Sequence, residues 1–216
     1  MQQGDPTGRD EWGSPEHAAG FITRRSSLGR ASDADEVMDE FVSTDVSRVL
    51  DLGTGAGHLI DVLRARRPMA EFVGLDISPT MLASSRARVA DDPHITILEH
   101  DLATPLPELG RFDAVVSAFA IHHLEHARKR ELLQEALACL APGGLFANLE
   151  HVSSPSARLH TAFLAAIGSG PQEEDASNRC LDVESQLCWM RSAGLIDVDC
   201  SWKWREMALL TGVLPA

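Results

Sequence analysis

The chain has 216 residues, a length that fits one domain or two small ones, and its 44% hydrophobic and 24% charged residues are typical of globular proteins. The 19 Lys and Arg residues against 32 Asp and Glu residues give a formal net charge of −13, which disfavours nucleic-acid and anionic-membrane partners. No tyrosine is present, so mechanisms that use a tyrosine acid, base or nucleophile are excluded.

The four cysteines are scattered and form no CxxC pair, so the sequence indicates neither a zinc site nor a thioredoxin-type site. The first residues lack the basic start and apolar core of a secretory signal, and no apolar run approaches the roughly 18 residues of a membrane span. We therefore expect a cytoplasmic protein with reduced thiols, no bound metal and no membrane partner.

From the N-terminus, residues 1–15 are rich in Gly, Pro, Asp and Gln, which predicts a frayed tail, and residues 17–42 carry the pattern of one or two helices. Short apolar runs then alternate with helical stretches. Strands are predicted at 48–52, 72–76, 95–98, 112–118 and 145–152, and helices at 57–66, 79–89 and 125–140. This alternation predicts right-handed crossovers and a parallel sheet covered on both faces.

The C-terminal part has a different order. Its pattern predicts a helix at 155–167, a polar, acidic loop at 168–178, a second helix at 181–193 and two strands at 198–204 and 207–213. Because only a short connection joins these two strands, we expect an antiparallel hairpin. The predicted sheet is therefore mostly parallel, with one antiparallel strand near its end.

The strongest local signal is the segment Asp51-Leu52-Gly53-Thr54-Gly55-Ala56-Gly57, in which a strand runs through three alternating glycines into a helix. Glycines let the backbone turn sharply and approach a ligand closely. The spacing does not match the dinucleotide fingerprint, because His58 or Ile60 falls where the last glycine is required, and the Lys-Ser/Thr of a phosphate loop is absent. The acidic Asp51 repels a pyrophosphate and suits a cationic or zwitterionic ligand.

An acid also ends the second predicted strand. Asp76 lies 76 − 57 = 19 residues after the last loop glycine, where a carboxylate can accept hydrogen bonds from both hydroxyls of a ribose. The alternative is that Asp51 and Asp76 each cap the helix that follows. The three glycines at this spacing favour a nucleoside ligand over that alternative.

Five motifs resemble, in the same order, those of the class I S-adenosylmethionine-dependent methyltransferases over roughly residues 45–152. They are the glycine segment, Gly74-Leu75-Asp76-Ile77-Ser78, His100-Asp101-Leu102, Phe112-Asp113-Ala114-Val115-Val116-Ser117 and Leu140-Ala141-Pro142-Gly143-Gly144. The resemblance implies a Rossmann-like α/β fold whose seven-stranded, mostly parallel sheet has one antiparallel strand and helices on both faces. We then expect an N-terminal tail and cap helices over 1–44 and the methyltransferase domain over 45–216.

The same resemblance implies S-adenosyl-L-methionine as the cofactor. Its methionine part is expected on the glycine loop, its ribose on Asp76, its adenine against Ile77 with the exocyclic amine on Asp101, and its methyl group beside Ser117. The full set of expected cofactor-binding residues is Asp51, Gly53, Thr54, Gly55, Gly57, Asp76, Ile77, Met81, Asp101, Leu102 and Ser117.

Two histidines follow the fourth strand, beside the expected methyl position. Because its pKa is near neutral, His123, our first candidate, or His122 can act as the base if the acceptor has to lose a proton. The alternative is that one of them caps the next helix and the other packs in the wall. His151, at the end of the fifth strand, faces the same rim, so a three-histidine metal site is a further, weaker interpretation. His58 is expected to pack or to contact the cofactor side.

The acceptor pocket is expected from parts outside the motifs, namely the N-terminal helices, the segment after the fifth strand and the loop at 168–178. Arg24 and Arg25 either approach an acidic group or lie on a solvated helix face. Trp202 and Trp204 alternate on one strand face, where they either form an aromatic platform or pack in the core. The run Glu173-Glu174-Asp175 is either a solvated loop or favours a cationic acceptor.

The sequence thus predicts an enzyme that transfers a methyl group by in-line displacement to a small-molecule acceptor, which the net charge of −13 favours as neutral or cationic. The alternative is a protein that binds the cofactor and modifies it, or binds it without methyl transfer. A nicotinamide-dependent oxidoreductase is disfavoured by the glycine spacing and the missing tyrosine. An RNA methyltransferase is disfavoured by the charge.

Overall fold

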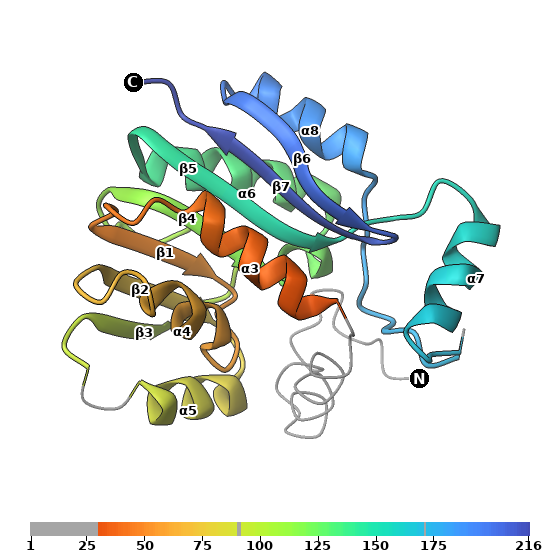
Figure 1. Ribbon diagram of the computed structural model, residues 1–216, viewed down its shortest axis with the longest axis horizontal. Coiled ribbons are helices and arrows are strands. Elements are labelled where there is room, and N and C mark those ends of the chain that lie inside the picture. Colours follow the sequence, from red (N-terminus) through yellow and green to blue (C-terminus); the bar gives the residue numbers. More distant parts are fainter. Residues whose placement is uncertain (1–29, 90–91, 171) are drawn as a thin grey trace.

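The computed structural model describes residues 30–89, 92–170 and 172–216 (Figure 1). The tail predicted at 1–15, the helical pattern before residue 30, and the pair Arg24 and Arg25 lie outside the described residues. The first described helix, α3, runs over Ala31–Phe41. The helical pattern predicted up to residue 42 is therefore confirmed from residue 31 onward.

The seven strands form one sheet in the order β3-β2-β1-β4-β5-β7-β6. Strands β1 to β5 pair in parallel, and β7 pairs antiparallel with both β5 and β6. The predicted sheet, mostly parallel with one antiparallel strand, is confirmed. Its order reverses between β1 and β4, and such a switch point opens a crevice at the carboxyl ends of the strands. The strands are β1 Arg48–Leu52, β2 Glu71–Asp76, β3 Ile95–Glu99, β4 Phe112–Ala118, β5 Leu140–His151, β6 Ile196–Trp204 and β7 Met207–Val213.

The fifth strand begins earlier than predicted. It covers Leu140–His151 rather than 145–152, because its first residue already pairs with Phe112 of β4. The Gly143 N–H also donates a hydrogen bond to the Leu214 carbonyl at 2.9 Å. The Pro-Gly-Gly segment therefore follows the end of helix α6 (His126–Cys139) and also forms the irregular first part of strand β5. The local sequence pattern predicts the end of the helix but not the early start of the strand.

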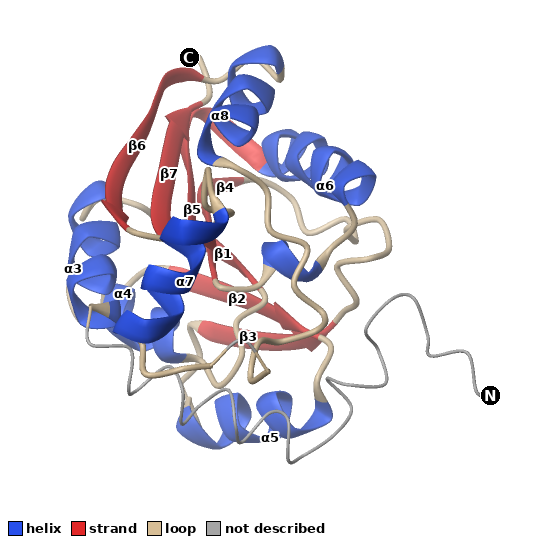
Figure 2. Ribbon diagram, turned by 90° about the vertical axis from the view of Figure 1, so that its right-hand side faces the viewer, coloured by secondary structure: helices blue, strands red, loops and turns tan. Residues whose placement is uncertain are grey.

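Helices cover both faces of the sheet (Figures 1 and 2). Buried side chains of α3, α4, α5 and α7 join one core cluster, and those of α6 and α8 join the cluster on the opposite face. Strand β4 contributes to both clusters, with Val116 in the first and Val115 in the second. None of the described helices combines the length and hydrophobicity needed to cross a membrane. The helices after α3 are α4 His58–Arg64, α5 Pro79–Arg88, α6 His126–Cys139, α7 Ala157–Ala166 and α8 Val183–Ser192.

Local signals fix where the helices near the sheet edge begin. Helix α5 has Pro79 at its first position and Ser78 as its capping residue, so it starts three residues after β2 ends. Helix α8 starts after Asp182, whose carboxylate accepts a hydrogen bond from the Ser185 N–H at 2.8 Å. These caps set the lengths of the connections that form the carboxyl edge of the sheet.

Candidate active site

The three alternating glycines follow the carboxyl end of β1, and all lie in the left-handed region. Their φ angles are 74° at Gly53, 54° at Gly55 and 81° at Gly57. The Gly53 N–H donates a hydrogen bond to the Leu75 carbonyl of β2 at 2.9 Å. A Cβ atom at Gly53 would lie 2.2 Å from the Cβ of Ala120, in the turn after β4. Glycine is therefore required here both by the backbone turn and by the close packing of two strand ends.

Asp76, at the end of β2, reaches across to this loop. One of its carboxylate oxygens accepts a hydrogen bond from the Gly55 N–H and the other from the Ser78 N–H, both at 2.8 Å. Burial raises the pKa of Asp76, and the backbone hydrogen bonds oppose that rise. The glycine loop and Asp76, which are separate signals in the sequence, are therefore joined by a hydrogen bond in the structure. Each carboxylate oxygen keeps a lone pair with which to accept a ligand hydroxyl.

Further predicted cofactor residues surround the loop. The side chain of Asp51 is buried on β1, where the residue pairs with Gly74 of β2. A Cβ atom at Gly74 would lie 2.9 Å from Cγ2 of Thr54, so a glycine lets the loop pack against β2. The sulfur of Met81 lies 4.0 Å from the position of a Cβ at Gly55, which places α5 beside the loop.

The residues expected on the adenine side come from the ends of β2 and β3. Ile77 and Asp101 are half-buried, and Leu102 is buried with a methyl group 3.8 Å from the Cβ position of Gly53. Leu102 therefore lies close to the glycine loop. Ser117 is buried in β4, and its hydroxyl donates to the last carbonyl of β1 at 2.7 Å, which joins the two strand ends.

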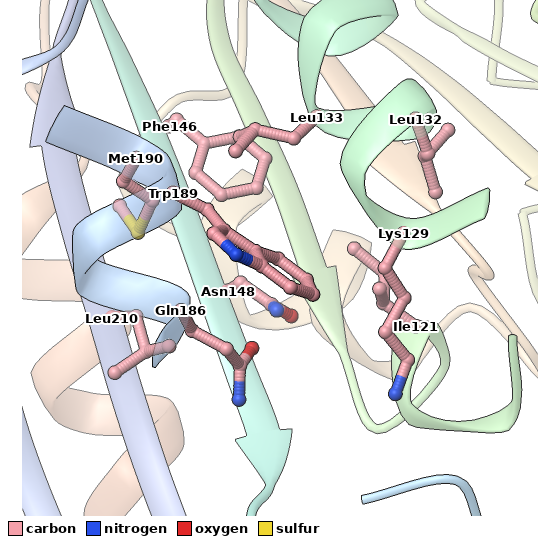
Figure 3. A pocket seen from close by; sticks show the side chains of 10 residues that line it. All are labelled: Ile121, Lys129, Leu132, Leu133, Phe146, Asn148, Gln186, Trp189, Met190 and Leu210. Atoms are coloured by element: carbon pink, nitrogen blue, oxygen red, sulfur yellow. The ribbon is translucent and has the colours of Figure 1, made fainter. Parts of the chain in front are cut away.

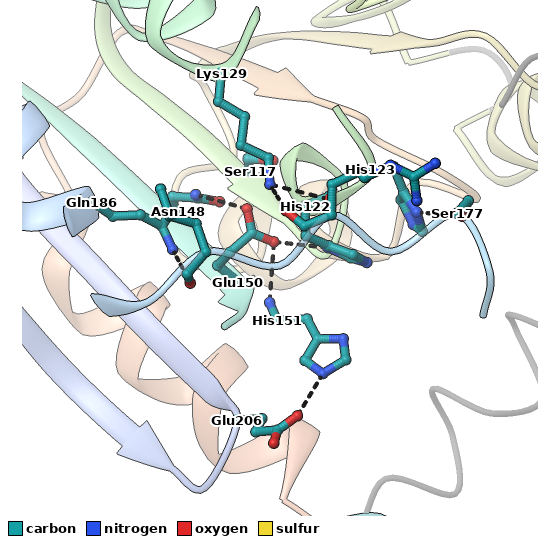
Figure 4. Close-up of polar contacts among 12 residues, drawn as sticks. Ser117, His122, His123, Lys129, Asn148, Glu150, His151, Ser177, Gln186 and Glu206 are labelled. Atoms are coloured by element: carbon teal, nitrogen blue, oxygen red, sulfur yellow. Dashed lines mark hydrogen bonds and ion pairs between the residues drawn. The ribbon is translucent and has the colours of Figure 1, made fainter. Parts of the chain in front are cut away.

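A histidine cluster lies where β4 and β5 end (Figure 4). The short 3-10 helix η1, Ile121–His123, follows β4 and carries His122 and His123, while His151 ends β5. The ring centroids of His122 and His123 are 3.9 Å apart, and those of His122 and His151 are 5.6 Å apart. The structure thus brings the three histidines to one rim, as the order of the strand ends predicted.

His122 is buried and paired with a buried carboxylate. Its Nδ1 lies 2.8 Å from Oε1 of Glu150. The same Oε1 accepts a hydrogen bond from the His151 backbone N–H at 3.1 Å, and Oε2 accepts one from the Asn148 amide at 3.2 Å. Burial lowers the pKa of His122 well below its usual value, and the charges of His151 and Lys129 act in the same direction. His122 is therefore a neutral base at neutral pH, and Glu150 fixes the orientation of its ring.

His123 has a different partner. Its Nδ1 lies 2.7 Å from the Ser177 hydroxyl, and that hydroxyl donates to Asp175 at 2.7 Å. Because the hydroxyl has one proton and gives it to the carboxylate, His123 carries its own proton on Nδ1. The acidic loop predicted at 168–178 therefore contributes to the site, because Asp175 orients His123 through the Ser177 hydroxyl.

His151 is held as a cation at the same rim. Its Nε2 lies 3.2 Å from Glu206, a buried carboxylate in the β6–β7 turn. Burial alone would lower its pKa, but the contacts with Cys180 and Glu206 raise the pKa of His151 to about 10. The same Glu206 also lies 3.0 Å from Nδ1 of His160 on α7. The cluster thus holds one neutral and one charged histidine, His122 and His151, side by side.

A small pocket lies beside this network, between α6, α8 and the sheet (Figure 3). Its walls include the apolar side chains of Phe146 and Trp189, and its polar groups come from Lys129, Asn148 and Gln186. The side-chain oxygen of Asn148 is buried and has no hydrogen-bond partner within the described residues. The volume of about 30 Å³ fits roughly two water molecules, not a substrate.

Other predicted residues have structural partners. Trp202 and Trp204 are half-buried against the core, and the Trp204 ring lies 6.2 Å from that of Phe163, so they pack as the simpler interpretation held. The Nε2 of His58 lies 2.8 Å from the carboxylate of Asp35 on α3, a contact between two helices. Within the described ranges, no three His, Cys, Asp or Glu side chains are arranged to hold a metal ion.

Sequence reasoning missed the acids that hold these histidines, Glu150 and Glu206. Glu150 had a detectable signal, because a carboxylate in an apolar strand, one residue before His151, needs a buried partner. Glu206 gave no such signal, because it lies beside a hairpin turn, and turns normally expose their charged side chains.

The fold and the site together define a class of protein. An open α/β sheet with a left-handed glycine loop after β1, an acid at the end of β2 and an antiparallel β7 between β5 and β6 is the Rossmann-like arrangement of methyltransferases. Residues 49–144 match a family model described as a methyltransferase domain, which agrees with the class I S-adenosylmethionine-dependent methyltransferases that the five sequence motifs resemble.

Curated relatives agree with this assignment. A demethylmenaquinone methyltransferase of Thermus thermophilus is 43% identical over 110 residues, which cover 50% of this chain and 49% of the relative. A trans-aconitate 2-methyltransferase of Variovorax paradoxus is 30% identical over 158 residues, which cover 73% of this chain and 58% of the relative. The chain thus spans about half the length of the curated relatives that it matches.

Solved structures share the fold. An O-methyltransferase family protein from Burkholderia thailandensis has a TM-score of 0.72 at 18% identity, covering 93% of this chain and 60% of that one. Human N-acetylserotonin methyltransferase in complex with S-adenosylmethionine has a TM-score of 0.67 at 19% identity, covering 94% of this chain and 57% of that one. At these identities the similarity establishes the architecture.

Proposed function

We propose that this chain binds S-adenosylmethionine and transfers its methyl group to a small-molecule acceptor by in-line displacement. The observation that carries the proposal is the junction between Gly55 and Asp76. Their hydrogen bond of 2.8 Å joins the glycine loop to the acid after β2. A ligand that combines a ribose with a charged amino-acid tail meets both halves of this junction at once.

The residues at this edge fit the cofactor. Asp76 keeps lone pairs for two ribose hydroxyls, Asp51 places a carboxylate near the loop for an ammonium group, and Ile77 and Leu102 supply apolar contacts for a base. When bound, the cofactor supplies an activated methyl group whose leaving group is a neutral thioether. The chain's own task is then to position the two partners and to exclude water.

Among the histidines, we propose His122 as the group that takes a proton when the acceptor has to lose one. Its Nδ1 faces Glu150, so Nε2 is the atom that accepts the proton. Burial raises the pKa of the Glu150 carboxyl, and the charge of Lys129 and the hydrogen bonds from Asn148 and the His151 N–H oppose that rise. In its ionised form Glu150, 2.8 Å away, stabilises the imidazolium that forms. His123, the first candidate from the sequence, takes second place, because its Nδ1 contacts the Ser177 hydroxyl, whereas the Nδ1 of His122 contacts a carboxyl group.

A small-molecule acceptor is supported by the names of two relatives, which specify demethylmenaquinone and trans-aconitate. We favour a neutral or cationic acceptor, because a net charge of −13 lowers the local concentration of anions. The alternative function is cofactor binding without transfer, or modification of the cofactor itself. Both functions use the same cofactor residues, so only a test with acceptors separates them.

Calorimetric titration tests the cofactor half of the proposal. S-adenosylmethionine and S-adenosylhomocysteine should both bind, whereas NAD should give no heat of binding. Replacement Asp76→Asn should weaken the binding of S-adenosylhomocysteine by about 1–3 kcal/mol, because it removes charge-assisted hydrogen bonds. The matched control is Asp113→Asn, since Asp113 also accepts two backbone N–H groups, at 2.7 and 2.9 Å, but at the opposite edge of the sheet. Tight NAD binding, or equal effects of the two variants, would contradict the proposal.

A metabolite-extract screen tests the transfer half. The protein is incubated with an extract and labelled S-adenosylmethionine, and the products are searched for a new methylated mass. The proposal expects a labelled product that depends on the wild-type chain. If the cofactor binds and no labelled product forms, the alternative without methyl transfer is supported.

A further inference from the structure

Two neighbouring cations in the first turn of α6 contact opposite halves of the candidate site. Lys129 donates to the carbonyls of His122, at 3.2 Å, and Arg179 on the histidine side. Arg128 instead extends to the turn that follows β3, on the adenine side. Successive side chains on a helix diverge by about 100°, so a single turn reaches both halves.

Arg128 fixes that turn through its backbone. Its Nε donates to the Leu102 carbonyl and its Nη2 to the Thr104 carbonyl, both at 2.8 Å. The same guanidinium pairs with Glu135 through both Nη atoms, at 2.6 and 2.7 Å. Glu135 in turn accepts a hydrogen bond from the Leu106 N–H at 2.9 Å. One ion pair on α6 therefore holds three backbone groups of the turn.

This ion pair is stronger than an ordinary surface pair. The side chain of Arg128 is only 11% exposed and that of Glu135 is 27% exposed. Their mutual hydrogen bonds raise the pKa of Arg128 and lower the pKa of Glu135, so both groups stay charged. Forked, partly buried pairs of this kind are geometrically specific. Residues 100–111 have no helix or strand of their own. The Ala103 and Thr104 N–H groups donate to Asp101 at the start of the turn, both at 2.9 Å, and the contacts with Arg128 and Glu135 hold the turn against α6.

We propose that Arg128, held by Glu135, is a positioning residue for the adenosine part of the cofactor. The proposal rests on the proposed function, in which Leu102 contacts the base, and on the expectation that the neighbouring Asp101 binds the exocyclic amine of the adenine. Arg128 acts through the backbone of the turn that carries those two residues, and it fixes the turn before the ligand arrives. Without Arg128, cofactor binding has to order the turn first, and that ordering lowers the affinity.

The test is calorimetric titration of S-adenosylhomocysteine into the full chain. Replacement Arg128→Met should weaken binding about 10-fold to 100-fold, and Arg128→Lys, which keeps the charge but loses the fork, should lie between Met and wild type. Glu135→Gln should weaken binding in the same direction by a smaller factor. The matched control is Arg130→Met, because Arg130 lies on the same helix but stacks over Trp189, 5.3 Å from the ring centroid.

Hydrogen exchange separates positioning from a general loss of structure. In Arg128→Met the Leu106 amide should exchange faster while amides of the central strand β1 keep their wild-type protection. Protection lost equally in both places, or affinities of Arg128→Met and Glu135→Gln within about twofold of wild type, would overturn the proposal. If the wild-type chain itself does not bind S-adenosylhomocysteine, the proposed function fails first, so the two failures are distinct.

Discussion

Gly53 shows how one residue can meet two requirements at the same time. Its φ of 74° disfavours any side chain, and a Cβ there would lie 2.2 Å from the Cβ of Ala120. We expect Gly53→Ala to lower the free energy of unfolding by about 2–5 kcal/mol, the sum of left-handed strain and overpacking. Urea denaturation measures this loss.

Gly143 supplies the matched control for that prediction. It has a similar φ of 78°, but no atom lies within 4 Å of a Cβ at this position. Gly143→Ala should therefore cost only the backbone strain, about 1–2 kcal/mol. The difference between the two variants measures the contact with Ala120. Equal losses would show that packing between the strand ends is not what requires a glycine at residue 53.

His122 makes a prediction about the pH dependence of activity. Only its neutral form accepts a proton, and burial lowers its pKa well below 6.5. Turnover with an acceptor found in the extract screen should therefore persist as the pH falls through 6.5 and should decline only at a lower pH. His122→Gln should reduce the rate by about 100-fold or more. Initial rates from pH 5 to 8 test both points.

Two results would contradict this role of His122. One is an acid limb centred at or above pH 6.5, which would indicate an ordinary, solvated base. The other is a His122→Gln variant with nearly wild-type turnover. His123→Gln is the informative companion, because loss of turnover in that variant alone would return the role of base to His123, whose ring is oriented by Ser177.

At the scale of elements, α7 contacts the β6–β7 turn through His160 and through Arg205, whose guanidinium donates to the Ala162 carbonyl at 3.0 Å. His160 on α7 lies 3.0 Å from Glu206 and 3.3 Å from Glu174 in the following loop. Burial opposes its protonation, yet the contacts with Glu206 and Glu174 raise the pKa of His160. One of the contacts that hold α7 beside the histidine rim is therefore favoured by protonation of a side chain.

This linkage has a definite sign. Because the folded pKa of His160 is raised, its stabilising contribution is complete below about pH 6.5 and is lost as the pH rises through the folded pKa. We expect His160→Gln to lower the melting temperature by about 2 °C at pH 6 and by less at pH 9. Glu174→Gln, which removes one of the two carboxylate partners of His160, should also lower the melting temperature more at pH 6 than at pH 9, but by a smaller amount. A difference that grows with pH would contradict the assignment.

Strand and helix boundaries were predictable wherever a local pattern decided them. The glycines after β1, the proline that starts α5 and the apolar run of β4 are short-range signals, and the structure has these elements at the predicted positions. The start of β5 was not predictable, because its pairing with Phe112 depends on how β4 lies beside it. A proline-glycine segment normally ends a strand or helix, but here contacts with Phe112 and Leu214 keep the segment within β5.

At the scale of the whole molecule, the topology alone places the site. Parallel strands bring all their carboxyl ends to one edge, and the reversal of order between β1 and β4 separates the connections that follow them. The core on each face is a separate cluster, and strands such as β1 and β4 contribute side chains to both clusters, so the edge that carries Asp76 and His122 lies at the end of strands that are packed on both faces. The described helix α3 contributes Met38 to one of these clusters.

The sequence by itself determined the class of fold, the glycine loop, Asp76 and the histidine rim, because each depends on a short pattern or on the shared edge of parallel strands. Only the tertiary structure decided the partners. Glu150 lies 28 residues from His122, Glu206 lies 55 residues from His151, and Ser177 lies 54 residues from His123. Such pairs are set by strand register and by the docking of helices and loops, which depend on packing across the whole core.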